Sequence, residues 1–582
     1  MAERLSLAAV ARAYATGVTP RTLLTDCLAR IAEDQTFNAW ITVLSEAQLK
    51  AYLDALEALP RGPLWGVPFA VKDNIDVAGL PTTAGCAAFA YTPSVSAPVV
   101  QALIDAGAIP LGKTHLDQFA TGLVGTRAFS GPCLNSVDPA YLSGGSSSGS
   151  AVALGRGHVA FSLGTDTAGS GRVPAAFNGL YGLKPSRGLL STKGVVPACE
   201  SLDCVSIFAP DLETLSAVAE VAGTYDPADV TQQPWAPGLR PVPGAGRGRL
   251  AVPLREQVAL DGAYSLALWD EALAQAEAAG FSLVPFDAEP LLAAGRLLYE
   301  GPWVAERYAV VAPILESAPD SLFPVTRSIV EPAAAFKATE AFAAFAKLKT
   351  LGHALAGAIA DTEAMLLPTA PGLYTQEEAA ADPVGLNSRL GTWTNFMNLL
   401  GYCGLAVPTG QTDAGLPFGI TLARPEGEDA ALLALAAQWT GAVARPWAGR
   451  DPGLTIAVCG AHMSGLPLNG QLQSLGGIFL EATESAPLYR FCHLPGGPPE
   501  RPGMVREAEG AAIAVELWHL PYAGVGQLLE KIPSPLGLGT VPLADGREVK
   551  GFICEAFGAE GGRDISAFGG WRAYLAEQKA AS

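Results

Sequence analysis

The spacing of apolar and polar residues predicts alternating helices and strands along most of the chain. Apolar residues recur every three to four positions over residues 6–16 and 20–33, which predicts two amphipathic helices. Thr19 and Pro20 mark the start of the second helix. The apolar run at 38–44 predicts a strand, and helical spacing resumes after it. This alternation favours an α/β domain whose functional loops lie at strand ends.

Three polar segments come at or after short apolar runs in the middle of the chain. Lys72 ends the run GVPFAVK, and the strand pattern HVAFSLG continues directly into TDTAGSGR. Between them, YLSGGSSSGSAVALG is a serine-rich loop followed by a helix of small residues. These three segments are the candidates for the chemistry of the domain.

A change of sequence pattern predicts a second domain. The proline-rich loop at 226–248 interrupts the α/β pattern, which restarts at RLAVPL. After residues 445–453 the chain becomes glycine-rich and mostly β-patterned. We therefore expect one domain over residues 1–450 and a smaller one over 455–582.

The charge balance argues against partners that are polyanions. The chain has 56 acidic and 37 basic residues, a formal net charge of −19. This field repels nucleic acid and anionic membranes. A small anionic substrate is compatible with it only where a local arginine or lysine outweighs the overall charge.

The cysteines and the first residues predict a cytoplasmic protein. The nine cysteines are scattered without a C-x-x-C pair, which favours reduced thiols over disulfides or a zinc site. Glu3 and Arg4 precede the first helix, so we expect no signal peptide. The uncharged stretch 390–412 contains Asn395 and Pro408, and we expect buried core with a turn there. Nothing in the sequence indicates a metal or an organic cofactor.

The serine-rich loop has several possible roles. A flexible Gly/Ser linker is one, but the composition does not shift across the loop. A phosphate-binding loop would require G-x-x-x-x-G-K-[ST], which is absent here. Residues 145–149 match the G-x-S-x-G elbow of serine hydrolases, yet the apolar strand that should precede such an elbow is missing.

A fourth possibility pairs this loop with a second serine and a lysine. Ser170 follows three small or flexible residues that leave backbone N–H groups free to form an oxyanion site. A serine must lose its proton to attack, and Lys72 is the obvious base in a chain with six histidines. To accept a proton, the lysine must be neutral. Lowering its pKa from about 10.4 to about 7 corresponds to about 4.6 kcal/mol, which burial could supply.

Three motifs in order, VPFAVKDN, GGSSSGSAVALG and GTDTAGSGRVPAAFNGLYGLKPSRG, resemble the amidase signature family over roughly residues 1–450. The resemblance implies a mixed central sheet covered by helices, and a Ser–Ser–Lys triad. Ser148 departs from the usual glycine of the family pattern, and we expect this change to be tolerated. The implied roles are Ser170 as nucleophile, Ser146 as bridging serine in a cis peptide, Lys72 as base, and the N–H groups of Thr167, Ala168, Gly169 and Ser170 as oxyanion hole.

The segment YEGPWVAER resembles allophanate hydrolases, whose substrate is urea bearing a carboxylate on one nitrogen. Tyr299 and Arg307 are eight residues apart and could share one helical face over two turns, unless Pro302 starts the helix late. The resemblance implies that both bind the substrate carboxylate, and an arginine fork suits this task. It also suggests Thr121 and Gly122 as substrate contacts.

The C-terminal motifs VCGAHMSGLPLN, YRFCHLPGGPPERPGM and IPSPLGLGTVPLADGREVKGFICE resemble the second domain of full-length allophanate hydrolases. The resemblance implies an α+β, γ-glutamylcyclotransferase-like fold and a homodimer. It implies that the first domain releases ammonia and leaves N-carboxycarbamate, which the second helps to decarboxylate. His462 is the candidate residue there, with His493 and Glu530 as weaker ones. The alternatives are an amidase for biuret or tRNA-linked glutamine, or a non-catalytic binding protein.

Overall fold

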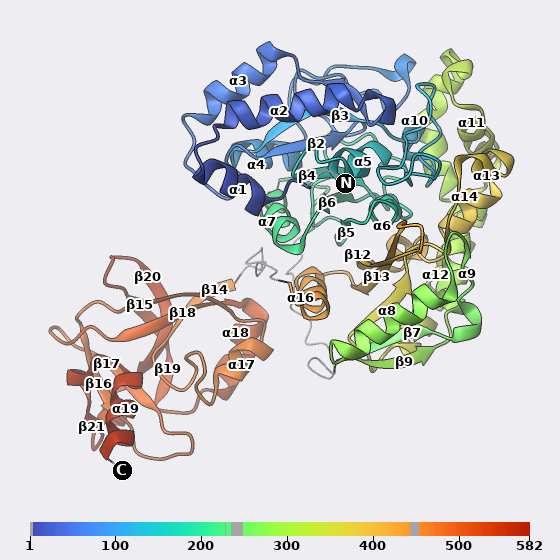
Figure 1. Cartoon of the computed structure of the whole chain (residues 1–582). Helices are drawn as coiled ribbons and strands as arrows, with labels where there is room; N and C mark the ends of the chain where they lie inside the picture. Colours follow the sequence, from blue (N-terminus) through green and yellow to red (C-terminus); the bar gives the residue numbers. More distant parts are fainter. Residues whose placement is uncertain (1–3, 227, 234–247, 443–452, 582) are drawn as a thin grey trace. The chain divides into compact units, whose positions relative to one another are not determined.

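The computed structural model describes residues 4–226, 228–233, 248–442 and 453–581 (Figure 1). The described residues form two compact units, one up to residue 442 and one from residue 453 onward. All nine cysteines lie within these ranges as buried free thiols.

An eleven-stranded mixed sheet forms the centre of the first unit, in the order β1-β3-β2-β4-β6-β5-β12-β13-β10-β7-β9. The strand β2 pairs in parallel with both β3 and β4, so the carboxyl ends of these strands lie at one edge. A separate two-stranded ribbon joins β8 and β11. The strands are β1 Trp40–Val43, β2 Pro68–Lys72, β3 Ile109–Thr114, β4 Phe161–Thr165, β5 Tyr181–Lys184, β6 Val205–Ala209, β7 Arg249–Pro253, β8 Asp261–Gly262, β9 Ser282–Phe286, β10 Ala364–Pro368, β11 Gly372–Leu373, β12 Tyr402–Gln411 and β13 Pro417–Pro425.

Helices cover both faces of this sheet, because its strands are apolar on both sides. On β2, Phe69 and Val71 face the core that α1, α4 and α7 complete, while Ala70 faces the core of α2, α3 and α5. The helices are α1 Leu7–Ala15, α2 Pro20–Glu33, α3 Glu46–Leu56, α4 Pro98–Asp105, α5 Ser148–Gly155, α6 Val173–Phe177, α7 Leu212–Ala222, α8 Leu266–Ala278, α9 Glu289–Glu300, α10 Val304–Ser317, α11 Pro324–Val330, α12 Ala338–Ala358, α13 Gln376–Ala381, α14 Gly385–Leu390, α15 Phe396–Leu400 and α16 Asp429–Thr440.

Local signals fix the early helices as the sequence predicts. The hydroxyl of Thr19 accepts a hydrogen bond from the N–H of Thr22 (3.2 Å), and Pro20 occupies the first turn of α2. Ser45 and Gln48 form a capping box at the start of α3. The predicted helices at 6–16 and 20–33 and the strand at 38–44 are therefore confirmed, with ends shifted by a few residues.

The uncharged stretch 390–412 forms buried core, as predicted. It contains the short helix α15, a left-handed turn at Gly401 and the strand β12. None of the helices in the described part of the chain combines the length and the apolar character needed to cross a bilayer.

The second unit has its own hydrophobic core, which includes Ile456, Trp518 and Trp571. A five-stranded sheet has the order β15-β18-β14-β20-β19, and a smaller sheet has the order β17-β16-β21. This mixture of sheets and short helices agrees with the predicted α+β class. The elements are β14 Gly453–Val458, α17 Asn469–Ser474, β15 Ile478–Glu484, β16 Tyr489–His493, β17 Pro502–Arg506, β18 Ala514–Pro521, α18 Tyr522–Lys531, β19 Leu536–Pro542, β20 Glu548–Cys554, β21 Arg563–Asp564 and α19 Trp571–Ala581.

Candidate active site

Lys72 meets two hydroxyls at the edge where β2 and β4 end. Its Nζ lies 2.7 Å from Ser146 Oγ and 2.7 Å from Thr165 Oγ1. Lys72 is the last residue of β2, Thr165 is the last residue of β4, and the two strands are parallel neighbours. Ser146 comes from the serine-rich loop, and its peptide bond with Gly145 is cis. The structure therefore brings together two of the three predicted triad residues.

The Lys72 amine is fully buried, and burial lowers its pKa to about 7. The carboxylates of Asp117, Asp203 and Asp166 act in the opposite direction, and the charge of Arg307 lowers the pKa a little further. At neutral pH a substantial fraction of the amine is thus uncharged. A neutral amine 2.7 Å from Ser146 can accept the proton of that hydroxyl.

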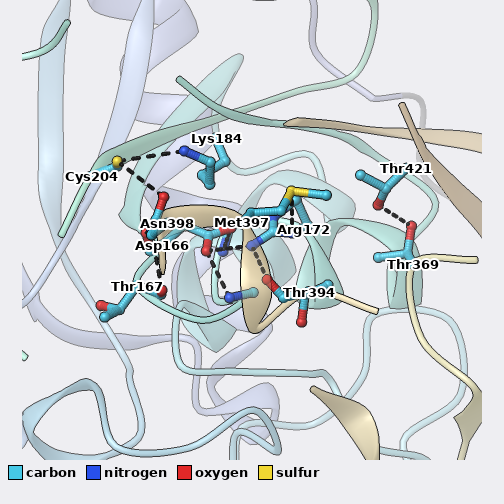
Figure 2. A network of polar contacts seen from close by, with 12 residues as sticks. Asp166, Thr167, Arg172, Lys184, Cys204, Thr369, Thr394, Met397, Asn398 and Thr421 are labelled. Carbon is cyan, nitrogen blue, oxygen red and sulfur yellow. Dashed lines mark hydrogen bonds and ion pairs between the residues drawn. The ribbon is translucent and has the colours of Figure 1, made fainter. Parts of the chain in front are cut away.

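Ser170 lies on the buried loop between β4 and α6, and a buried ion pair holds this loop (Figure 2). Asp166 accepts a bidentate pair of hydrogen bonds from Arg172, at 2.8 and 2.9 Å. Burial alone would raise the pKa of Asp166, but pairing with Arg172 outweighs it and the pKa lies below its ordinary value. Within the described residues the Ser170 hydroxyl has no hydrogen-bond partner, and its side chain is 3% exposed.

The backbone amides of the same loop differ in whether they are free to bind a substrate oxygen. The N–H of Gly169 donates to Asp166 Oδ1 (2.7 Å), so this amide is engaged, contrary to the prediction that it is a free oxyanion donor. In the described ranges no acceptor pairs with the N–H groups of Thr167, Ala168 and Ser170. Three of the four predicted donors are thus available.

Side chains outside the loop fix its remaining polar groups. The Thr167 hydroxyl donates to the buried carboxylate of Asp203. Asn398 of α15 donates to the carbonyls of Asp166 (2.7 Å) and Thr167 (3.0 Å), as Figure 2 shows. Because the carbonyls of Asp166 and Thr167 and the carboxylate of Asp166 are all paired, the loop holds its amides in a fixed orientation.

The predicted substrate loop wraps around Asp117. This carboxylate accepts hydrogen bonds from the N–H groups of Gly125 (3.0 Å) and Arg127 (2.9 Å). The N–H of Asp117 in turn donates to the carbonyl of Ser146 (3.2 Å). Gly122 packs against the same carboxylate, since a Cβ placed on it would lie 2.7 Å from Asp117 Oδ2. The loop is therefore tied directly to the bridging serine.

Tyr299 and Arg307 meet, but not on one helix. The helix α9 ends at Glu300, and α10 begins at Val304 after Gly301 and Pro302. The second helix thus starts late, after Pro302, which is the alternative that the sequence left open, and the two residues do not share one helical face. The Arg307 guanidinium nevertheless lies 5.3 Å from the centre of the Tyr299 ring, a cation–π contact between two helices.

Arg307 is a buried cation with free donors. Its Nη1 donates to the carbonyl of Ala120 and to Thr121 Oγ1, both at 3.3 Å. Its Nε and Nη2 are buried and have no partner, and no carboxylate in the described part of the chain pairs with it. Two adjacent N–H groups of a guanidinium left open in this way can bind a carboxylate at both oxygens.

An apolar cluster connects the Arg307 cation with the loop at residues 166–172 that carries Ser170, which we call the Ser170 loop. It contains Ala168 of that loop, Leu298 and Trp303 of the Arg307 region, and Leu399 of α15, with Tyr299 packed against them. The positive charge of Arg307 also lowers the pKa of Lys72. Apolar packing and charge therefore connect the open guanidinium with the serine–lysine group.

Ser148, the departure from the family glycine, is accommodated by a histidine. Its hydroxyl lies 2.9 Å from Nδ1 of His115, whose Nε2 lies 3.0 Å from the carbonyl of Gly131. Burial lowers the pKa of His115, so the ring is neutral and donates to this carbonyl while accepting from Ser148. The expectation that the exchange is tolerated thus has a structural basis.

In the second unit, His462 lines a pocket of about 350 Å³. Its Nε2 lies 3.2 Å from Gln471 Oε1, its ring stacks on Phe552, and burial lowers its pKa. Arg501 and Lys531 line the same pocket, and the buried Nε of Arg501 has no partner within the described ranges.

The two weaker candidates of the second unit lie elsewhere. His493 contacts Tyr574 at 2.9 Å and does not line the pocket, and Glu530 is exposed on α18.

Several residues of the site were missed at the sequence level. Thr165 and Asp166 stand directly after the strand HVAFSLG, so their place at the strand end could have suggested them. Arg172 offers no such signal, because an arginine in a glycine-rich loop is usually a surface charge. The free donors of Arg307 also depend on its burial, which the sequence does not show.

Comparison with known proteins fits this geometry. The sequence model of the Amidase family matches residues 22–433. The chain belongs to the amidase family. A second model, Allophanate hydrolase C-terminal domain, matches residues 454–576 of this amidase.

Individual relatives cover either the whole chain or its first unit. Urea amidolyase of Saccharomyces cerevisiae is 41% identical over 575 residues, which is 92% of this amidase and 31% of the relative. The amidase thus spans about a third of the urea amidolyases that it matches. A glutamyl-tRNA(Gln) amidotransferase subunit from Deinococcus radiodurans is 33% identical over 75% of this chain and 97% of its own length.

A solved structure is similar over both units. The structure of an allophanate hydrolase variant from Kluyveromyces lactis is 38% identical, with a TM-score of 0.83 and coverage of 99% of both chains. The urea amidolyase structure from the same organism is also 38% identical, with a TM-score of 0.81, and is covered over 36% of its length.

Proposed function

We propose that this amidase hydrolyses allophanate to ammonia and N-carboxycarbamate in its first unit. Neutral Lys72 accepts a proton from Ser146, which takes the proton of Ser170 as Ser170 attacks the terminal carbamoyl carbon. The oxyanion is stabilised by the N–H groups of Thr167, Ala168 and Ser170. Ser146 then returns the proton to the leaving ammonia, and water hydrolyses the acyl-enzyme.

The observation that carries the choice of substrate is the state of Arg307. Two of its side-chain nitrogens are buried and have no partner in the described part of the chain. A buried cation with open donors is costly unless a ligand completes it, and a carboxylate does so with two parallel hydrogen bonds. Allophanate places a carboxylate on the far side of the urea nitrogen from the carbon that Ser170 would attack. The similarity to allophanate hydrolase of Kluyveromyces lactis supports the same substrate.

Ammonia release from allophanate and from biuret, measured side by side, tests this proposal. Biuret has a neutral amide where allophanate has the carboxylate, so we expect allophanate to be hydrolysed much faster. Arg307→Ala should abolish this preference. Equal rates with both amides, or intact allophanate turnover in Arg307→Ala, would favour another amidase activity. Failure of a fluorophosphonate probe to label Ser170 would favour a non-catalytic binding protein.

For the second unit we propose decarboxylation of N-carboxycarbamate in the pocket of His462. The buried Nε of Arg501, which has no partner among the described residues, and the side chain of Lys531 suit a dianion. The His462 imidazole, after taking up a proton from solvent, can deliver it to the nitrogen from which carbon dioxide departs. In the His462→Ala variant of the two-unit chain, ammonia should be released at the normal initial rate, and carbon dioxide should be released more slowly than ammonia. Simultaneous release in this variant would contradict a role for His462.

The binding partners, the oligomeric state and the cellular location of the enzyme also remain predictions. The net charge of −19 argues against nucleic acid or an anionic membrane surface as partner, and a small anionic substrate is compatible with it because Arg307 supplies a local positive charge. A homodimer and a cytoplasmic location follow from the family resemblance and the free thiols, respectively. Light scattering of the purified chain would test the dimer.

A further inference from the structure

Thr394 packs against the Ser170 loop, and Asn395 packs against the helix that carries Tyr299. The contact of Thr394 with the Ser170 loop is close, since a Cβ placed on Gly169 would lie 2.4 Å from Thr394 Oγ1. Gly169 has a φ of +138°, so this close approach depends on glycine. The next residue, Asn395, packs against Gly295 of α9, where a Cβ would lie 3.4 Å from Asn395 Cβ. Tyr299 follows Gly295 one helical turn later, on the same side of α9.

The side chains of Thr394 and Asn395 both have polar atoms without partners. Thr394 is fully buried and Asn395 is 7% exposed. Among the described residues, Thr394 Oγ1 and Asn395 Oδ1 have no hydrogen-bond partner. Most buried polar groups in proteins are paired, because leaving one unpaired is unfavourable. Two neighbouring unpaired oxygens beside the Ser170 loop are therefore free to accept hydrogen bonds from a ligand.

The groups assigned so far to bind oxygens of the substrate are hydrogen-bond donors. The guanidinium of Arg307 and the loop amides are all donors, and they suit the oxygens of a substrate. Allophanate carries N–H groups as well, namely a terminal NH₂ and a central N–H. These need acceptors. Thr394 Oγ1 and Asn395 Oδ1 are unpaired oxygens that can supply them.

We propose that Thr394 and Asn395 accept hydrogen bonds from the N–H groups of the substrate, and that one of them reads the central N–H. This role rests on the proposed function of the first unit and adds to it. Arg307 selects for a carboxylate, whereas Thr394 and Asn395 select for nitrogen rather than carbon between the two carbonyl carbons. A site that hydrogen-bonds a substrate N–H discriminates against an analogue that lacks it.

The test compares allophanate with malonamate, in which a CH₂ group replaces the central N–H. The variants are Thr394→Val and Asn395→Leu, which keep the shape and remove the acceptor. Loss of a single such hydrogen bond corresponds to about tenfold in kcat/KM. We therefore expect the ratio of kcat/KM for allophanate to that for malonamate to fall about tenfold in one of the two variants. If malonamate only inhibits, its competitive inhibition constant serves the same comparison.

Two further variants separate recognition from folding. Thr421→Val removes a buried hydroxyl that pairs with Thr369 at 2.9 Å (Figure 2), and it should leave the ratio unchanged. Thr394→Ser keeps the hydroxyl and should retain the wild-type ratio.

Failure of the role proposed for Thr394 and Asn395 can be distinguished from failure of the proposed function. An unchanged ratio in both Thr394→Val and Asn395→Leu, with normal allophanate turnover by the wild type, overturns this proposal alone. Absence of allophanate turnover in the wild type overturns the proposed function instead.

Discussion

The guanidinium of Arg307 lies 5.3 Å from the ring of Tyr299, although the two residues belong to different helices. Gly301 and Pro302 end α9 and let the chain turn before α10 begins. The ring covers one face of the guanidinium, and the carbonyl of Ala120 occupies one of its donors. The N–H groups that remain open among the described residues are those of Nε and Nη2, the pair that can bind both oxygens of a carboxylate.

Replacing Arg307 by lysine should lower kcat/KM for allophanate thirtyfold or more. An ammonium keeps the charge but cannot make two parallel hydrogen bonds to one carboxylate. Truncating one partner of such a buried pair costs about 2–5 kcal/mol, and each 1.4 kcal/mol corresponds to tenfold. Steady-state kinetics with allophanate check this value.

The control for this change is Arg327→Lys. Arg327 lies on α11, pairs with Glu331, and is 37% exposed, so its exchange should leave the kinetics unchanged. Equal losses in both variants, or none in Arg307→Lys, would contradict the assignment of Arg307 as the carboxylate ligand.

Arg172→Gln should destabilise the first unit by about 3 kcal/mol, because it leaves the buried carboxylate of Asp166 without its cation. Urea unfolding of both proteins measures the difference. A matched exchange, Arg255→Gln, removes an exposed pair with Asp270 and should cost less than about 1 kcal/mol. Similar losses of unfolding free energy in the two variants would show that the buried Asp166–Arg172 pair stabilises the protein no more than an exposed pair does.

The same ion pair predicts a dependence on pH. The folded-state pKa of Asp166 lies below its ordinary value, so its stabilising contribution is present above the unfolded value, about 3.9, and is lost as pH falls through the folded value. The difference in unfolding free energy between wild type and Arg172→Gln should therefore shrink below about pH 4. A difference that grows on acidification would have the wrong sign.

Ser148→Gly, which restores the family residue, should lower stability without affecting chemistry. It leaves Nδ1 of His115 without its donor in a buried position, which costs about 1–3 kcal/mol. The kcat/KM for allophanate should stay within about threefold. Ser148→Ala separates the lost hydrogen bond from the added backbone freedom of glycine. A large loss of turnover at unchanged stability would instead give Ser148 a part in catalysis.

Much of this site could be predicted from sequence because its residues stand at strand ends. Lys72 and Ser170 follow apolar strands, and parallel pairing of β2 with β4 brings those ends together. The helix break between Tyr299 and Arg307 could be suspected from Pro302 but not decided. The engagement of Gly169 by Asp166 could not be predicted, because it depends on how one loop folds back on its own first residue.

Lys72→Met should abolish activity and yet stabilise the protein at pH 7. The folded-state pKa of Lys72 is about 7, against an ordinary value of about 10.4. Between these values the unfolded chain binds a proton that the folded chain lacks, so wild-type stability rises with pH there. Methionine removes this dependence on pH but also removes the two hydrogen bonds of the amine. We therefore expect the free energy of unfolding at pH 7 to be higher by about 1–3 kcal/mol in Lys72→Met. A less stable variant would argue that the amine is charged in the folded protein.

Direct titration of the Lys72 amine is the decisive measurement. Lysine side chains labelled with ¹³C at Cε report their protonation by NMR, and the spectrum of Lys72→Met assigns the signal. We expect a midpoint near pH 7 in the resting enzyme. A midpoint above about pH 9.5, close to that of an ordinary lysine, would mean that Lys72 cannot serve as the base at neutral pH.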